Sequence, residues 1–168
     1  MNIFTTIMMA YLAFVSFTAV SYAATAEVKW TDYEKYRDID PGEGHRKHFR
    51  ENTFYNFEKH FTKLAAKLPE GQVLKIEVTD VDLAGDTHAA GISRLRIVKD
   101  IYFPRMKFSY QLLDAGGNEL EANAVELKDM SFMMSATLRY KNESLRYEKQ
   151  MIDDWFFDTF ENRLINKK

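Results

Sequence analysis

The sequence predicts an α+β fold in which two helices pack on one face of a mostly antiparallel sheet of four to five strands. Three observations favour this fold. Several short segments alternate apolar with polar residues, which is typical of half-buried strands. Two longer segments place apolar residues at steps of three and four, the spacing of one helix face. The helices do not alternate regularly with the strands, which indicates an α+β architecture.

The first half of the chain contains one predicted strand, one turn and one helix. Residues 27–31 form a short strand, because Val28 and Trp30 fall on the same face. A turn is expected at 38–44, where one proline and two glycines disfavour helix and strand. The helix runs over residues 45–68 and stops before Pro69; its apolar stripe consists of Phe49, Phe54, Phe57, Phe61, Leu64, Ala65 and Leu68.

The middle of the chain predicts the remaining strands. Residues 74–78 alternate cleanly, and the alternation then changes phase, so we expect a bulge or a departure from the sheet near Asp80. A loop is predicted at 85–91, followed by strands around 95–97 and 106–112. A glycine-rich hairpin turn at 114–118 leads into a strand over 119–128, whose phase changes at about 123–124.

The second helix is predicted over residues 142–165. Its stretch RYEKQMIDDWF, residues 146–156, combines three carboxylates and two cations with a tryptophan. The helical spacing buries Trp155 with Leu145, Ile152, Phe156, Phe160 and Leu164. Asp153 and Asp154 point about 100° apart and therefore cannot form a catalytic pair. We expect Asp153 to make a surface pair with Lys149, so that Asp153→Asn is nearly silent.

Composition excludes several classes of function. The formal net charge of −2 argues against a nucleic-acid partner, since such partners are held by excess Lys and Arg. The chain has no cysteine, which excludes disulfides and thiolate metal sites. Residues 27–168 have a suitable length for a single globular domain.

The first 26 residues predict a secretory signal peptide. They contain no Asp, Glu, Lys or Arg, and they end in small residues that allow cleavage after Ala23 or after Ala26. The same run is long enough to remain as an uncleaved membrane anchor, which is the alternative. With cleavage, we expect a periplasmic or secreted protein without stable membrane insertion.

Two charged segments are candidates for polar chemistry. Asp80, Asp82, Asp86 and His88 form a polar loop that could serve an enzyme, although their spacing is not that of a calcium loop. The basic run at residues 45–50 predicts a solvated surface, with an anion site as the alternative. The sequence contains no nucleophile or phosphate-binding motif, so we assign no catalytic, cofactor-binding or metal-binding residue.

The methionine-rich connector, residues 129–141, is a candidate partner surface. Met130, Met133 and Met134 could bind an adaptable partner, but methionines also fill irregular gaps in a core. We expect core filling and keep partner binding as the alternative.

Four segments carry a resemblance to a known family: KLPEGQVLKIEVTDVDLAGD, LRIVKDIYFPRMKFSYQLLDAGG, VELKDMSFM and RYEKQMIDDWF. Together they resemble the bacterial envelope family catalogued as domain of unknown function 3016. The resemblance implies a secreted or periplasmic single domain of a Gram-negative bacterium, without an assigned activity, cofactor or partner. We expect a non-catalytic binding or accessory module of the cell envelope, which binds another envelope protein through the connector or an edge strand. An enzyme with a site around residues 80–88 is the alternative.

Overall fold

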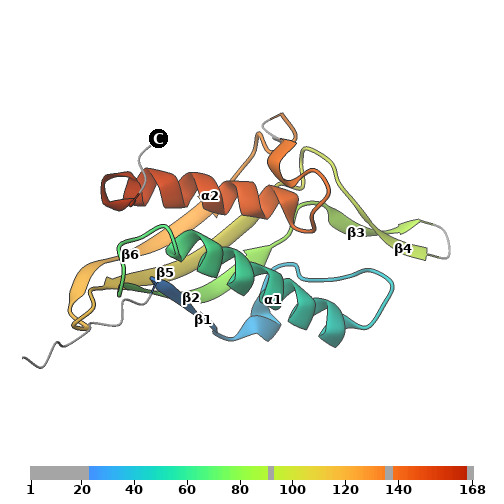
Figure 1. Ribbon diagram of the computed structural model, residues 1–168. Coiled ribbons are helices and arrows are strands. Elements are labelled where there is room, and N and C mark those ends of the chain that lie inside the picture. Colours follow the sequence, from blue (N-terminus) through green and yellow to red (C-terminus); the bar gives the residue numbers. More distant parts are fainter. Residues whose placement is uncertain (1–22, 91–92, 135–137, 166–168) are drawn as a thin grey trace, which may run out of the picture.

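A four-stranded sheet carries two helices and a projecting hairpin in the computed structural model, which describes residues 23–90, 93–134 and 138–165 (Figure 1). Most of the predicted signal peptide, residues 1–22, lies outside the described residues. The elements are β1 (Thr25–Trp30), α1 (Arg46–Ala65), β2 (Val73–Asp82), β3 (Asp86–Ala90), β4 (Ser93–Ile97), β5 (Arg105–Leu113), β6 (Glu119–Lys128) and α2 (Arg146–Phe160), with the short 3₁₀ turns η1 (Tyr33–Lys35), η2 (Leu138–Tyr140) and η3 (Glu161–Arg163).

The sheet has the strand order β1-β2-β5-β6. Strand β1 runs parallel to β2, and the other neighbours are antiparallel. Both helices lie on the same face of this sheet (Figure 1). The predicted α+β fold, with two helices on one face of a mostly antiparallel sheet, is therefore confirmed.

The core lies between the helices and the covered face of the sheet. Alternate residues of β2 and β5 are buried, because successive strand residues point to opposite faces. Trp155 of α2 meets Phe108, Tyr110 and Phe160 at ring-centroid distances of 4.8, 5.4 and 5.7 Å. The predicted aromatic face of the second helix is thus confirmed, although α2 is shorter than predicted, since Leu145 takes a left-handed conformation just before Arg146.

The predicted bulge lies in β2. The register with β5 shifts between Val78 and Asp80, and buried positions change from even to odd residue numbers at this point. Val81 therefore enters the core, and Asp82 turns away from it. A second irregularity was predicted at residues 123–124, and this prediction is wrong. The register of β6 shifts instead at Leu113, because the turn inserts one extra residue before Glu121.

The prediction of a loop at residues 85–91 is also wrong for most of that range. Residues Asp86–Ala90 form β3, which pairs antiparallel with β4 and extends away from the main sheet (Figure 1). The sequence pattern missed this strand because a projecting two-stranded ribbon is defined by its backbone ladder rather than by one buried face.

The most informative correction concerns Asp153, which is not on the surface. Its side chain is buried between α1 and α2, and its Oδ1 lies 2.9 Å from His60 Nε2. Its Oδ2 accepts hydrogen bonds from Arg139 Nη1 at 2.7 Å and from the Tyr140 hydroxyl at 2.8 Å. Burial would raise the pKa of Asp153, but the bonds from His60, Tyr140 and Arg139 hold this pKa below its ordinary value. The predicted partner Lys149 pairs instead with Glu143.

A second carboxyl group of α2, that of Glu148, is also buried. It accepts a hydrogen bond from the backbone N–H of Ala84 at 2.7 Å, and burial raises its pKa. Within residues 23–90, 93–134 and 138–165, no helix is both long and apolar enough to cross a membrane.

Candidate functional site

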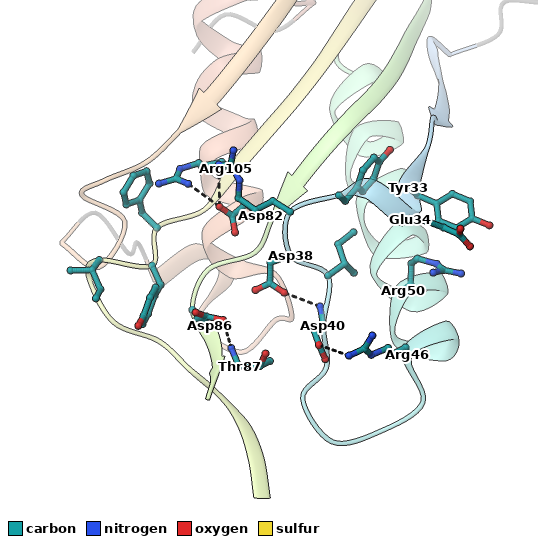
Figure 2. Close-up of a pocket in the computed structure, with 17 residues that line it drawn as sticks. Tyr33, Glu34, Asp38, Asp40, Arg46, Arg50, Asp82, Asp86, Thr87 and Arg105 are labelled. Carbon is teal, nitrogen blue, oxygen red and sulfur yellow. Dashed lines mark hydrogen bonds and ion pairs between the residues drawn. The ribbon is translucent and has the colours of Figure 1, made fainter. Parts of the chain in front are cut away.

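A polar pocket with a volume of about 620 Å³ lies between η1, the first turns of α1, the end of β2 and the base of the β3–β4 hairpin (Figure 2). Its charged side chains come from segments that are far apart in the sequence: Glu34, Arg37, Asp38, Asp40, Arg46, Arg50, Asp82, Asp86 and Arg105. Aromatic and aliphatic side chains complete the walls: Tyr33, Tyr36, Ile39, Ile101, Tyr102 and Phe103.

The floor of the pocket is held by Asp38, in the predicted turn that precedes α1. Asp38 forms a parallel bridge with Asp82, and the backbone N–H of Asp38 donates to the carbonyl of Val81. The carbonyl of Asp38 accepts a hydrogen bond from the N–H of Leu83. The turn is therefore attached to β2 immediately after the bulge, and this attachment brings the two carboxylates to the same region.

Arg96 of β4 connects this turn to the hairpin. Its Nη2 donates to both carboxylate oxygens of Asp38 at 2.9 Å and to the carbonyl of Asp40 at 2.7 Å. Its Nη1 donates to the carbonyl of Gly85 at 2.9 Å. One guanidinium thus fixes the relative positions of β2, β4 and the turn, as a planar group with five donors can do.

The carboxylates of Asp38 and Asp82 have raised pKa values. For Asp38, burial raises the pKa, the Arg96 charge lowers it, and the nearby Asp86 raises it again. For Asp82, burial again has the largest effect; Arg105 and Arg37 lower the pKa, while Asp38 raises it. The arginines therefore compensate these acids only in part, and the acidic wall attracts cations.

Asp40 has the opposite character. Its Oδ2 accepts one hydrogen bond from Arg46 and one from Arg94, each at 3.1 Å. Burial would raise its pKa, but the backbone N–H of Gly42 and the two arginine charges lower it below the ordinary value. One carboxylate here balances two guanidinium groups, so this side of the pocket retains positive charge.

Two arginines of the pocket are stacked on aromatic rings. The Arg50 guanidinium carbon lies 4.3 Å from the ring centroid of Tyr33, and that of Arg105 lies 4.1 Å from the ring of Phe103. Stacking orients a guanidinium plane and leaves its N–H edge available for an anion. Arg105 also donates to Asp82 at 3.1 Å, whereas Arg50 makes no ion pair with any carboxylate in the part of the chain that the structure describes.

A family model described as "Protein of unknown function (DUF3016)" matches residues 24–158. The chain belongs to this family. No curated protein and no solved structure matches the chain. The resemblance inferred from the four quoted segments is thus confirmed at the level of the family, and the matched region includes the whole lining of the pocket.

The predicted polar loop contributes in part to the pocket of this DUF3016 domain. Asp82 and Asp86 line the pocket, but Asp80 does not; its Oδ1 accepts a hydrogen bond from the backbone N–H of Arg37 at 2.8 Å. The backbone of His88 pairs with Leu95 in the hairpin, and its side chain lies outside what the structure describes. The sequence did not single out Asp38, although the turn that carries it was predicted.

The basic run at the start of α1 divides between the pocket and the solvent. Arg46 and Arg50 line the pocket, whereas Lys47 does not, and its side chain is 80 % exposed. Among the described residues, no group of three or more His, Cys, Asp or Glu side chains is arranged to hold a metal ion.

The methionines of the connector are on the surface, so the expectation that they fill the core is wrong. Met130, Met133 and Met134 are 65 %, 49 % and 92 % exposed. The neighbouring Phe132 takes the buried position and packs edge-on against Tyr147, with 4.7 Å between ring centroids. Phe132 takes a buried position in this segment while the three methionines face the solvent, so the methionines remain a candidate partner surface.

Proposed function

We propose that this protein is a non-catalytic binding module of the bacterial cell envelope and that its ligand occupies the polar pocket. The observation that carries the proposal is the arrangement of Asp38, Asp82 and Asp40, each held by arginine in a preformed cavity. A volume of about 620 Å³ lies within the usual range for ligand sites, about 300–1,000 Å³. A preformed pocket with oriented charges binds a ligand without a large ordering cost.

The ion pairs favour binding over catalysis. A general acid or base must gain or lose a proton during each turnover. Both oxygens of Asp38 are engaged by Arg96, and Asp82 contacts Arg105 and Arg37 at 3.1 and 3.6 Å. Protonation of either carboxylate would weaken these pairs, and protonation of Asp38 would also disturb the attachment of the hairpin through Arg96, so the acids serve recognition better than proton transfer.

The second candidate function is an enzyme with its site around residues 80–88. The raised pKa values of Asp38 and Asp82 favour it, since catalytic acids have this property. Asp82→Asn separates the two functions. For a binding module, the variant retains a weakened affinity for the ligand and nothing is turned over. A ligand that wild type converts to product, and that Asp82→Asn binds without converting, would establish the enzyme.

We also propose a periplasmic or secreted location, with cleavage after Ala23. The uncharged segment 1–26 supports the location. Ala24 is buried, and Thr25 donates a hydrogen bond to the carbonyl of Gln72 at 3.0 Å. Cleavage after Ala26 would remove two paired residues of β1, so we expect mass spectrometry of the secreted protein to find a chain that begins at Ala24; a chain that begins at Glu27 would contradict this site.

Crosslinking in cells tests the binding site. A photoreactive residue placed at Ile101, a pocket residue that is 64 % exposed, should capture a component of the envelope. Tyr55, 60 % exposed on α1 and absent from the pocket lining, is the matched control. Position 134 tests the methionine surface. Products from position 134 with none from position 101 would reject the pocket and assign binding to the connector.

A further inference from the structure

The α1 wall of the pocket is suited to a carboxylate. Arg46 and Arg50 are one helical turn apart on α1 and both line the pocket; Arg46 points toward Asp40, and Arg50 lies beside Tyr33 and Glu34 (Figure 2). Arg50 is oriented by Tyr33, and Arg46 shares Asp40 with Arg94. The guanidinium groups of this wall thus carry more positive charge than Asp40 neutralises. The N–H edge of a guanidinium group matches the geometry of a carboxylate.

The opposite wall is suited to an ammonium group. Asp38, Asp82 and Asp86 converge there from the turn, from β2 and from β3 (Figure 2). Burial is the largest cause of the raised pKa of Asp38 and of Asp82, and repulsion from a neighbouring carboxylate, Asp86 for Asp38 and Asp38 for Asp82, raises each pKa further. An ammonium between these carboxylates would relieve the repulsion and would regain, through hydrogen bonds, part of the hydration that it loses in the pocket.

Ligands with a single sign of charge fit this pocket less well. A polyanion would meet the five carboxylates of the lining, and a polycation would meet its four arginines. The aromatic rings of Tyr102 and Phe103 and the side chains of Ile39 and Ile101 provide apolar area between the charged groups. The complementary ligand therefore has a positive end, a negative end and a compact backbone with limited apolar surface.

We propose that the pocket binds the zwitterionic form of a short peptide, with the terminal carboxylate on Arg46 and Arg50 and the terminal ammonium at Asp82 and Asp86. This inference rests on the proposed binding function, and it names the chemical class of the ligand. A peptide is favoured over a single amino acid because a pocket of about 620 Å³ exceeds the size of one residue.

Isothermal titration with three probes tests the proposal on the mature chain. The probes are trialanine, N-acetyl-trialanine and trialanine amide, which differ only in the charge at one end. We expect trialanine to bind, and each blocked form to bind about tenfold more weakly or worse, because each loses one charge-assisted contact. Failure of trialanine to bind, or equal binding of all three probes, would overturn the proposal.

Two variants assign the ends of the ligand. Arg50→Gln should weaken binding of trialanine about tenfold and leave the already weak binding of the amide nearly unchanged. Asp86→Asn should also weaken the binding of trialanine about tenfold, but it should leave the binding of N-acetyl-trialanine nearly unchanged. The asparagine Oδ1 can still accept the hydrogen bond from the Thr87 N–H. Lys47→Gln, on the same helix but outside the pocket, is the matched control and should bind all probes like wild type.

Selective loss makes the test independent of folding. A variant that fails to fold loses all three probes equally, whereas a variant that has lost one contact loses only the probe that uses it. If Arg50→Gln weakens trialanine and trialanine amide to the same extent, the assignment of the carboxylate to α1 is wrong. A crosslink at position 101 together with no binding of trialanine would reject the ligand class and leave the proposed binding function standing; absence of that crosslink would reject the pocket as the binding site.

Discussion

Asp153→Asn removes the negative charge from the contact between α1 and α2 while it retains the size of the side chain. Asp153 is 1 % exposed and accepts hydrogen bonds from Arg139 and Tyr140, and its other oxygen lies 2.9 Å from His60 Nε2. An asparagine oxygen can still accept from Arg139 and Tyr140, and its amide group then faces His60. The bonds from Arg139 and Tyr140 survive in a weaker form, and the contact with His60 survives in the tautomer whose Nε2 accepts the amide N–H.

The expected loss follows from these contacts. A hydrogen bond to a charged group contributes about 1.5–3 kcal/mol and a neutral one about 0.5–1.5 kcal/mol, so each contact weakens by roughly 1 kcal/mol. The contribution of Arg139 is smaller, because its side chain is 56 % exposed and water replaces part of the lost interaction. We therefore expect Asp153→Asn to lower the free energy of unfolding by about 2–3 kcal/mol at pH 7.

Urea unfolding followed by tryptophan fluorescence measures this change, and the neighbouring residue provides the control. Asp154 is exposed and accepts one hydrogen bond, from Gln150 at 2.7 Å. Asp154→Asn should change the free energy of unfolding by less than about 0.5 kcal/mol. If the two variants agree within 0.5 kcal/mol, the buried contact does not stabilise the fold and the reasoning above is refuted. A double-mutant cycle with Tyr140→Phe should also give a coupling energy above about 0.5 kcal/mol.

Three further predictions use the same unfolding assay. Since hydrogen bonds lower the folded-state pKa of Asp153, its contribution is complete above the unfolded-state pKa, near pH 4, and is lost as the pH falls through the lower folded-state pKa. The difference between wild type and Asp153→Asn should therefore narrow below about pH 4; a constant difference down to pH 2 would contradict the lowered pKa. Trp155→Ala should lower the free energy of unfolding by about 3 kcal/mol or more, because it leaves a cavity among three rings, and a loss under about 1 kcal/mol would show that the core closes without it. Gly42 and Gly117 both have positive φ, at +78° and +81°, but a Cβ at Gly42 would lie 2.4 Å from the Arg94 carbonyl oxygen, whereas one at Gly117 meets nothing within 4 Å. Gly42→Ala should thus lower the free energy of unfolding by at least about 1 kcal/mol more than Gly117→Ala. Similar losses for the two variants would show that the β3–β4 hairpin can shift away from the turn at Gly42 without cost.

The regular elements were predictable where one face of a segment is buried. The apolar stripe of α1, the alternation in β2 and the phase change before Val81 each reflect local spacing, which needs no knowledge of distant partners. The prediction failed for β3, because its pairing with β4 provides backbone hydrogen bonds without a one-sided apolar pattern. It failed in another way for the methionines, which are exposed, whereas Phe132 and Tyr140 of the same connector are buried.

The candidate site was predictable only in fragments. Asp82, Asp86 and the basic run at the start of α1 were noted separately, as an acidic loop and a solvated helix end. Nothing in their spacing shows that they face the same cavity, since the bulge in β2 and the attachment of Asp38 to it decide their positions. The sequence did not single out Asp38, because the proline and glycines of its segment indicate only a turn.

The sequence by itself determined the fold class, the family and the existence of most helices and strands, because the burial of apolar side chains leaves a periodic pattern in the local sequence. The tertiary structure decided the roles of the charged residues. Asp153 is separated from His60 by 93 residues, and the pocket combines side chains from residues 33 to 105. The energy of a charge depends on which donors and which water surround it, and those neighbours exist only after the elements have packed.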